Sequence, residues 1–368
     1  MRVMVLLHDA YGGHGGIAKF NRDLLAALAA HPDCEEVVAL PRFARFVPEP
    51  APAKVTFDTN ALGGAGSYLR RCLHWLFTGG RFDLVIAAHL HLLPPALLWR
   101  IRGTRPIAAV THGVEAWAPP AGMLARRLAA RADAYIAVSG VTRDRFVAWS
   151  KVDPAHCHVL PNCVDPSRFA PGPKSPALVA RYRLAGKRVV MTLGRLNPTE
   201  RFKGFDEVIE ALPALAGTVP DIIYVIAGDG GDRTRLEEKA RTLGVADRVV
   251  FTGYIDEAEK ADHFRLADLY VMPSRGEGFG IVFLEALACG IPVIGSRLDG
   301  GREALLDGKL GTLVDPTDRA ALVAAVRDGL ERPRGVVPAE LSRFSDTKFR
   351  ARVRDIVDRI RDGAVPAP

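Results

Sequence analysis

The chemistry that this sequence offers centres on two glutamates eight residues apart. Residues 275–286 read RGEGFGIVFLEA, in which Glu277 stands beside a Gly-Phe-Gly turn and Glu285 stands in an apolar run. A carboxylate that is buried without a partner is costly, so we expect Glu285 to pair with a group of the protein or of a ligand. The apolar run predicts a helix that begins near Gly280 and ends at Gly290.

This predicted helix separates two interpretations of the carboxylates. An acid and a nucleophile that cleave a glycosidic bond would face the two sides of that bond. Glu277 instead lies at a loop tip and Glu285 lies more than one turn inside the helix, so we expect them to face different parts of one long ligand. The first amides of the helix suit a phosphate, because the helix dipole is positive at that end.

Two cations follow a predicted strand that begins near residue 187. The segment GRLNPTERFKGFD places Arg195 directly after Gly194, at the end of the strand, and Lys203 before the next helix. A planar guanidinium and a compact ammonium together suit a diphosphate, so we predict a diphosphate clamp here. Arg201 we interpret as a surface charge.

Two further strand ends predict contacts with a nucleotide base. The glycine-rich turn AGDGGDR carries Gly228, and the segment FTGYI carries Tyr254. We expect the first to form a wall beside the base and the second to meet its edge through backbone groups.

In the first half of the chain, the turn DAYGGHGGIAKF leads from a strand into a helix that begins near Ile17. Its glycines let a ligand approach the backbone, and the helix start offers amides to a phosphate; a tight structural turn explains them equally well. The spacing is not that of the dinucleotide-binding fingerprint.

The segment PIAAVTHGVEAW places His112 at another strand end, where we expect it to donate to a sugar hydroxyl or phosphate, or to form part of an acceptor site. Further polar candidates on this rim are Asp9, Glu115 and, less well placed, His14.

The elements that must position these residues alternate between apolar strands and helices along the chain. A first series of predicted strands covers 2–8, 37–41, 83–89, 106–113 and 134–139, and a second begins near residue 187. This alternation predicts two doubly wound α/β domains with parallel sheets covered on both faces. The Pro-rich stretch 161–176 predicts the linker, and 344–363 predicts an amphipathic helix.

Composition limits the function classes. The 368 residues are 48% hydrophobic and 25% charged, which is typical of a globular protein. No apolar run reaches the roughly 18 residues that span a bilayer, and we interpret the opening MRVMVLLHDAYGG as a strand and not a signal peptide. Five scattered cysteines without a CxxC pair indicate reduced thiols and no zinc site.

Positive charge is concentrated in residues 61–131. This stretch holds nine arginines and two acidic residues, a surplus equal to the net charge of +7 of the whole chain. Arginines mixed with apolar and aromatic residues on short helices are typical of a protein that docks on an anionic membrane, although a solvated helix face is the simpler alternative. No nucleic-acid-binding motif accompanies them, and we expect no nucleic-acid partner. The candidates for a membrane or acceptor surface are Arg70, Arg71, Trp75, Arg126 and Arg127.

Taken in order, these motifs resemble those of glycosyltransferase family 4, a family of retaining enzymes with the GT-B fold. The segment EGFGIVFLE resembles its E-x7-E motif, and the resemblance covers nearly the whole chain through GGHGGIAKF, THGVEAW, LPNCVD, GRLNPTERFKGFD, IAGDG, FTGY, IPVIGS and GTLVDP. ERFKGFD is most similar to members that move mannose from GDP-mannose to a lipid-linked acceptor in exopolysaccharide biosynthesis. One departure is Cys163, where the family commonly has glycine, and we expect an altered backbone if that position needs positive φ.

The resemblance implies an α/β GT-B fold, with two facing doubly wound Rossmann-like domains and a cleft between them. It implies an acceptor-binding domain over 1–168, a donor-binding domain over 169–345, and a C-terminal helix over about 346–368 that crosses back to the first domain. Same-face attack through an oxocarbenium-like state would require neither a metal nor a protein nucleophile, so no cofactor is expected.

The resemblance also implies roles for the candidate residues. Glu277 would contact hydroxyls of the donor sugar, Glu285 the ribose, and Arg195 and Lys203 the diphosphate, with His112 beside the transferred sugar. Glu277, His112, Arg195 and Lys203 form the expected catalytic set. The donor-binding set adds Gly15, Gly16, Gly194, Gly228, Tyr254, Gly278, Phe279, Gly280, Ile281 and Glu285.

Three functions remain open at this point. The first is transfer of a hexose from GDP-mannose to a lipid-linked or glycan acceptor, by a cytoplasmic protein peripheral at the inner face of the membrane. The second is the same reaction with a UDP-sugar, because the motifs serve both bases. The third is a relative that does not transfer, such as a nucleotide-sugar epimerase or a sugar-nucleotide-binding protein.

Overall fold

The computed structural model describes residues 1–104 and 106–363, which form two compact units. Unit 1 comprises Met1–Cys163 and the C-terminal segment from Asp346, and unit 2 comprises Val164–Ser345. The division falls a few residues before the boundary at 168 that the sequence suggested. Arg105 and the last five residues of the predicted C-terminal helix lie outside the described residues.

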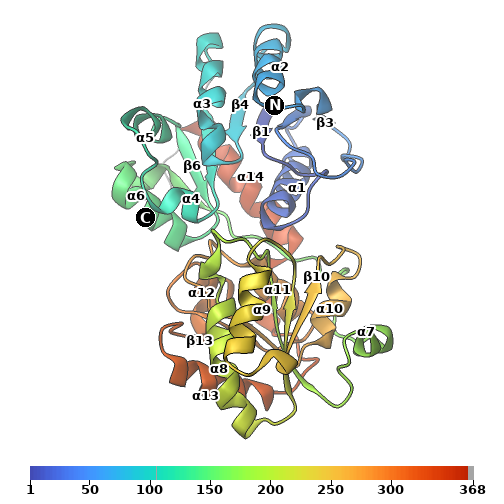
Figure 1. The fold of residues 1–368 in the computed structure, drawn as a ribbon. Coiled ribbons are helices and arrows are strands. Elements are labelled where there is room, and N and C mark those ends of the chain that lie inside the picture. Colours follow the sequence, from blue (N-terminus) through green and yellow to red (C-terminus); the bar gives the residue numbers. More distant parts are fainter. Residues whose placement is uncertain (105, 364–368) are drawn as a thin grey trace. The chain divides into compact units, whose positions relative to one another are not determined.

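Unit 1 is built on a seven-stranded parallel sheet in the order β3-β2-β1-β4-β5-β6-β7 (Figure 1). The predicted strands of the first series all form, whereas β3 and β7, of three residues each, are too short to show periodicity in the sequence. The strands are β1 (Arg2–Leu7), β2 (Glu36–Pro41), β3 (Val55–Phe57), β4 (Leu84–Ala87), β5 (Ile107–Thr111), β6 (Ala134–Ala137) and β7 (Cys157–Val159).

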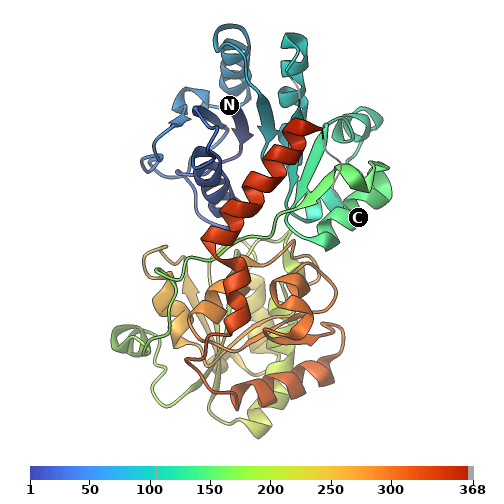
Figure 2. The ribbon, with the colours of Figure 1, turned by 180° about the vertical axis from the view of Figure 1, so that it is seen from behind.

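One face of this sheet is covered by α1 (Gly16–Ala29) and α14 (Asp346–Asp362), which pack against each other (Figure 2). Phe20 of α1 meets Phe349 of α14 edge to face, with ring centroids 5.9 Å apart. The amphipathic spacing of the C-terminal helix therefore places its apolar stripe inside unit 1.

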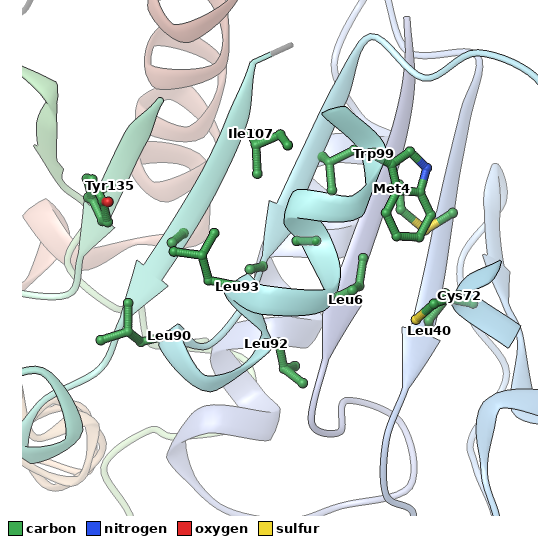
Figure 3. Close-up of a cluster of buried hydrophobic side chains, with 14 of the residues drawn as sticks. Met4, Leu6, Leu40, Cys72, Leu90, Leu92, Leu93, Trp99, Ile107 and Tyr135 are labelled. Atoms are coloured by element: carbon green, nitrogen blue, oxygen red, sulfur yellow. The ribbon is translucent and has the colours of Figure 1, made fainter. Parts of the chain in front are cut away.

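The second face carries the remaining helices of unit 1. They are α2 (Ala65–Thr78), α3 (Leu93–Ala96), α4 (Val114–Trp117), α5 (Met123–Ala129) and α6 (Gly140–Ser150), with the short 3₁₀ segments η1 (Thr59–Ala61), η2 (Leu90–Leu92), η3 (Leu97–Arg102) and η4 (Pro154–His156). Figure 3 shows part of the core here: Met4 and Leu6 of β1 face Leu93 and Trp99, while Cys72 of α2 lies beside Leu40. Met4 and Leu6 alternate with Val3 and Val5, so these residues of the interior strand β1 are buried on one face or the other.

Unit 2 is built on a six-stranded parallel sheet in the order β10-β9-β8-β11-β12-β13. Its strands are β8 (Arg188–Leu193), β9 (Ile222–Ala227), β10 (Val249–Gly253), β11 (Leu269–Met272), β12 (Val293–Ser296) and β13 (Thr312–Val314). Its helices are α7 (Pro176–Arg181), α8 (Phe205–Thr218), α9 (Arg233–Thr242), α10 (Lys260–Leu266), α11 (Ile281–Ala288), α12 (Gly301–Ala304) and α13 (Arg319–Leu330), with the 3₁₀ segments η5 (Arg201–Lys203), η6 (Ala246–Arg248), η7 (Leu306–Gly308) and η8 (Ala339–Phe344). Apolar residues of α8, α9 and α13 form a core with strands of this sheet.

Each sheet reverses its strand order at one place, between β1 and β4 in unit 1 and between β8 and β11 in unit 2. Loops after the two flanking strands diverge there, and open α/β sheets bind ligands in the resulting crevice. The predicted clamp follows β8 and the two glutamates follow β11, so the fold of unit 2 brings them to one edge.

Cys163 does not have the positive φ that a glycine-only position would require. Its backbone oxygen accepts from Lys19 at 3.1 Å, and its thiol donates to Asp23 at 3.4 Å. Cys163 is therefore accommodated at this position without a left-handed backbone.

Among the described residues, no helix has the length and apolar character that crossing a bilayer would need.

Candidate active site

The predicted clamp of unit 2 holds two cations on one carboxylate. Glu200 Oε1 lies 2.5 Å from Nη2 of Arg195, and Glu200 Oε2 lies 3.3 Å from Nζ of Lys203. The Arg195 side chain is 75% exposed, whereas those of Lys203 and Glu200 are mostly covered. Arg195 and Lys203 therefore converge as predicted, and both contact Glu200, which the sequence reasoning did not single out.

The loop after β11 lies directly against this clamp. The amide of Arg275 donates to the carbonyl of Phe202 at 2.8 Å. Gly276 packs so closely on the Phe202 ring that an added Cβ would come within 2.4 Å of it. The clamp and the loop that carries Glu277 therefore form one continuous surface of unit 2.

Asp299, from the segment after β12, fixes the position of Glu277. Its Oδ2 accepts from the Ser274 hydroxyl at 2.7 Å and from the Glu277 amide at 2.9 Å, while Oδ1 accepts from the Gly301 amide at 3.0 Å. Asp299 is fully buried, and burial raises its pKa to about 7. The sequence reasoning missed Asp299, because it lies under the loop after β11 only through the pairing of β11 with β12 in the sheet.

The two glutamates are separated as the sequence predicted. Glu277 is half-buried on the loop, and α11 begins four residues later at Ile281, with Gly280 at its N-cap in the left-handed conformation (φ +85°). The Phe279 side chain is buried against Phe344, so only its backbone faces the loop. The amides of this helix start, including those of Gly278 to Ile281, are the groups that a phosphate would meet.

Glu285 has a protein partner that the sequence reasoning did not find. Its carboxylate is 1% exposed and accepts from Nζ of Lys260, on α10, at 2.9 Å. Lys260 also lies 3.8 Å from Glu257 and 5.8 Å from the centre of the Phe169 ring. The question of what balances the buried charge is thus answered within unit 2, and a ribose would be an additional partner and not the sole one.

The loops expected beside the base come from strands next to the clamp. Gly228 follows β9 and approaches the backbone of Gly194 so closely that an added Cβ would lie 2.1 Å from the Gly194 oxygen. Tyr254 follows β10, the next strand outward, and is 47% exposed. Both therefore lie at the same edge of the sheet as Arg195.

In unit 1, the glycine turn after β1 is braced from within. The Asp9 carboxylate accepts from the amides of Ala10 and Gly12, and Arg22 donates to the carbonyls of Ala10 and Gly13. Burial raises the pKa of Asp9. Asp9 is therefore occupied in shaping the turn.

Gly15 differs from Gly12 and Gly13 of that turn. An added Cβ at Gly13 would collide with Asp9 at 2.3 Å, whereas at Gly15, which has φ +108° at the N-cap of α1, it would meet nothing within 4 Å. The open space at the helix start is where the amides can receive an anion.

His112 lies at the end of β5, but its hydrogen bonds change the predicted role. Nε2 lies 2.9 Å from the carbonyl oxygen of Ala88, so it carries the proton, and the Glu115 carboxylate accepts from the His112 amide. Burial lowers the pKa of His112. In the neutral form with Nε2–H on Ala88, Nδ1 is an acceptor, and the role of His112 toward a ligand stays a prediction.

Three further histidines surround His112. His89, after β4, stacks on His8, after β1, with ring centroids 4.3 Å apart, and lies 5.8 Å from His112 and 4.7 Å from His91. Burial lowers the pKa of His8 to about 4 and that of His89 to about 2. The only local sign of this cluster in the sequence is the segment His89-Leu90-His91. The ends of three strands, β1, β4 and β5, bring the histidines together.

The predicted membrane residues divide into two kinds. Asp58 binds Arg71 by a short ion pair and accepts from Trp75 Nε1 at 2.6 Å, so these two side chains face the protein. Arg70 is exposed, as are the apolar residues Leu69, Leu73 and Phe77, which follow at helical spacing on α2. Sequence reasoning missed this stripe because it singled out the larger indole. Arg126 and Arg127 of α5 are also exposed.

A possible metal-ligand group among the described residues is His31, Asp33 and Asp358. His31 Nε2 lies 3.1 Å from Asp358, its Nδ1 lies 3.1 Å from the Asp33 amide, and Arg361 pairs with Asp33 at 3.0 Å. The ring nitrogens of His31 already have protein partners. Within unit 1, this group therefore links α14 to the segment that follows α1.

Two family models match this chain. One, described as Glycosyltransferase Family 4, covers residues 14–168, and the other, described as Glycosyl transferases group 1, covers residues 179–345. The chain belongs to glycosyltransferase family 4.

Several curated relatives align with part of this chain. The chain is 44% identical, over 259 residues, to a GDP-mannose-dependent alpha-(1-6)-phosphatidylinositol monomannoside mannosyltransferase of Mycolicibacterium smegmatis, and 40% identical over 249 residues to the protein of the same name in Mycobacterium tuberculosis. These alignments cover 67% and 64% of this chain and 66% and 63% of the relatives. A D-inositol 3-phosphate glycosyltransferase of Geodermatophilus obscurus is 34% identical over 56% of this chain and 47% of that protein.

Solved structures share the fold. The HepE protein of Anabaena in complex with UDP and glucose aligns with a TM-score of 0.75 at 21% identity, over 97% of this chain and 99% of that one. The lipopolysaccharide outer core galactosyltransferase WaaB aligns with a TM-score of 0.72 at 18% identity, over 97% of this chain and 99% of that one. The two parallel Rossmann-like sheets are those of the GT-B fold.

Proposed function

We propose that this protein transfers mannose from GDP-mannose, with retention, to a lipid that carries an inositol phosphate headgroup. The observation that carries the proposal is the 44% identity to a relative whose name states both that donor and a phosphatidylinositol mannoside acceptor. A second group of relatives is named for an inositol phosphate acceptor, which supports an inositol as the shared element.

The geometry of unit 2 supports a division of labour on the donor. Arg195 and Lys203 bind the diphosphate and stabilise its charge as it leaves, with the amides around Gly280 as further donors. Glu277, held in place by Asp299, accepts from hydroxyls of the mannose. Glu285, with Lys260 behind it, accepts from the ribose.

In unit 1, neutral His112 is the candidate beside the transferred sugar and the acceptor, and Gly15 and Gly16 stay candidates for binding the donor's phosphates. A neutral imidazole with Nε2–H held by Ala88 can orient a hydroxyl through Nδ1. The departing phosphate then takes the proton of the attacking hydroxyl, as in the family's usual same-face mechanism.

The exposed stripe Leu69, Leu73 and Phe77, next to Arg70, supports peripheral docking of unit 1 on an anionic membrane. We place the protein at the inner face of the cytoplasmic membrane, where a nucleotide-sugar and a lipid acceptor meet.

The test is a transfer assay with three donors and three acceptors. GDP-mannose, UDP-glucose and ADP-glucose are each offered with vesicles that contain phosphatidylinositol monomannoside, phosphatidylinositol or neither, and lipid products are resolved by mass. We expect mannosyl lipid only with GDP-mannose and an inositol lipid. Transfer from UDP-glucose would overturn the donor assignment, and nucleotide binding without transfer to any acceptor would favour a non-transferring relative.

The two glutamates provide a test of the division of labour. Glu277→Ala should abolish transfer while GDP binding stays within about threefold, because Glu277 reads the sugar. Glu285→Ala should weaken GDP binding itself, measured by calorimetry. Loss of GDP binding alone in both variants would show that the roles are not divided.

A further inference from the structure

Unit 1 contains a basic surface pocket that the proposed reaction does not use. The pocket has a volume of about 650 Å³ and lies between α5 and the end of α6; we call it the α5–α6 pocket. It is lined by Arg126, Arg127, Arg131, Trp149, Ser150 and Pro119.

The arginines of this pocket lack acidic partners. All three side chains are exposed, and among residues 1–104 and 106–363 none of them forms an ion pair with a carboxylate. Arg126 donates from Nε to the carbonyl of Pro120 at 3.1 Å, which holds its guanidinium near the pocket. Three guanidinium groups that line one pocket without a carboxylate offer several donors to an anion, and a phosphate can accept from more than one of them.

The rest of the pocket is rigid. Trp149 donates from Nε1 to the carbonyl of Ala116 at 2.7 Å and meets the Phe146 ring edge to face at 5.2 Å. The carbonyl of Arg131 accepts from Arg100 at 2.6 Å, which fixes the end of α5. The indole NH is thus used inside unit 1, and the pocket offers guanidinium donors on one side and an immobile aromatic wall on the other.

A simpler explanation covers only part of this arrangement. Arg126 and Arg127 stand in the last turn of α5, where cations are stabilised by the helix dipole. Arg131 lies beyond the helix and gains little from the dipole, and the dipole accounts for neither the pocket nor its aromatic wall.

The side chains beside the arginines indicate that the anion belongs to a membrane surface. Met123 and Leu124, in the first turn of α5, are 69% and 71% exposed and precede Arg127 by four and three residues. Exposed apolar side chains one turn from arginines suit a membrane interface, where the former enter the acyl region and the latter bind lipid phosphates.

We propose that the α5–α6 pocket binds the headgroup phosphate of an anionic membrane phospholipid that is not the acceptor, while Met123 and Leu124 insert beside it. The inference rests on the membrane association proposed above, but not on the donor or the acceptor. The function of the α5–α6 pocket is to orient unit 1 on the bilayer by a defined contact and not only by diffuse charge.

The test measures sedimentation of the full chain with phosphatidylcholine vesicles that do or do not contain phosphatidylglycerol, which offers no inositol. Arg127→Gln/Arg131→Gln should lower partitioning onto the anionic vesicles by roughly tenfold or more. The matched control, Arg332→Gln/Arg343→Gln, removes the same charge from exposed positions of unit 2 and should change partitioning by roughly threefold or less. Equal losses in the two variants would overturn the proposal.

Two further measurements distinguish a specific site for a lipid phosphate from its alternatives. Arg127→Lys/Arg131→Lys keeps the charge but removes the bidentate forks, so part of the binding should be lost; unchanged binding would indicate diffuse charge and overturn the proposal. Protection of the chain against thermal unfolding by soluble glycerol 3-phosphate at the same phosphate concentration as the vesicles would identify a soluble-anion site instead. Vesicle binding through the pocket without mannose transfer would leave this inference standing and remove the proposed function.

Discussion

At the scale of single residues, the donor site is defined by partners that balance its charges before any ligand arrives. Glu285 is paired with Lys260, and Arg195 and Lys203 share Glu200. These pairs differ in burial, and burial determines how much each one contributes to stability or to binding.

The buried pair should matter for folding. Lys260→Met removes the partner of a carboxylate that is 1% exposed, and we expect a loss of about 3 kcal/mol in the free energy of unfolding, because an ion left in the interior loses most of its compensation. Urea unfolding followed by circular dichroism measures this loss. Lys260→Met/Glu285→Met should recover most of it, and a double variant less stable than the single one would contradict the assignment.

The partly exposed cluster of Arg195, Lys203 and Glu200 should matter for ligand binding. Because Glu200 occupies the two cations that a diphosphate needs, Glu200→Gln should tighten GDP binding by up to about fivefold, the scale of an exposed ion pair. Calorimetry at two salt concentrations measures the change. Glu237→Gln, which removes an exposed charge paired with Arg233, is the control and should have little effect. Weaker GDP binding in Glu200→Gln would mean that Glu200 orients the cations and does not compete for them.

At the scale of elements, parallel strand ends assemble both candidate sites. Loops after β8, β9, β10 and β11 supply the donor site of unit 2, and loops after β1, β4 and β5 bring His8, His89 and His112 together. Burial lowers the pKa values of His8, His89 and His112, so the contribution of these histidines to folding depends on pH.

The cluster predicts a loss of stability in mild acid. In the unfolded chain histidine binds a proton near pH 6.5, but burial, and then the charges of Arg42, His91 and His112, lower the pKa of His8 to about 4. Between these values the unfolded state binds more protons, so the free energy of unfolding falls as pH falls from about 6.5 to 4.

Thermal melts at a series of pH values across this window test the prediction. His8→Gln removes one titrating ring, so its melting temperature should fall less steeply with pH than that of the native chain. The comparison cancels the opposite contribution of Asp299, whose raised pKa favours the folded state as pH falls. Parallel slopes in the two proteins would contradict a role for the cluster.

At the scale of the whole molecule, the two units differ in how the chain builds them. Unit 2 is one continuous segment with its own sheet and core, whereas unit 1 needs the C-terminal helix α14 packed on α1. The donor-binding candidates from Gly194 to Glu285 all lie in the continuous segment.

We therefore expect residues 164–345 alone to fold cooperatively and to bind GDP within about tenfold of the full chain, without transferring mannose. Circular dichroism melts and calorimetry measure folding and binding. Arg195→Gln/Lys203→Gln in the same segment should lose GDP binding while keeping the melt. A segment that folds but does not bind GDP would show that the donor site is not contained in unit 2.

Much of this molecule followed from local sequence patterns. Alternating apolar segments predicted two parallel sheets, and the Gly-Phe-Gly turn before an apolar run correctly separated Glu277 on a loop from Glu285 in a helix. Arg195 and Lys203 were found because they flank a strand end. Such features depend on neighbours a few residues away, whose preferences the sequence displays directly.

Only the tertiary structure decided which groups these residues meet. Lys260, 25 residues before Glu285, reaches it because α10 packs against α11. Asp299, 22 residues after Glu277, reaches the loop because β11 and β12 are neighbours in the sheet. The inward turn of Trp75, the exposure of Leu69, Leu73 and Phe77, and the tautomer of His112 likewise depend on atoms supplied by other elements. Hydrogen bonds and burial act over a few ångströms in space, and a linear sequence does not display those distances.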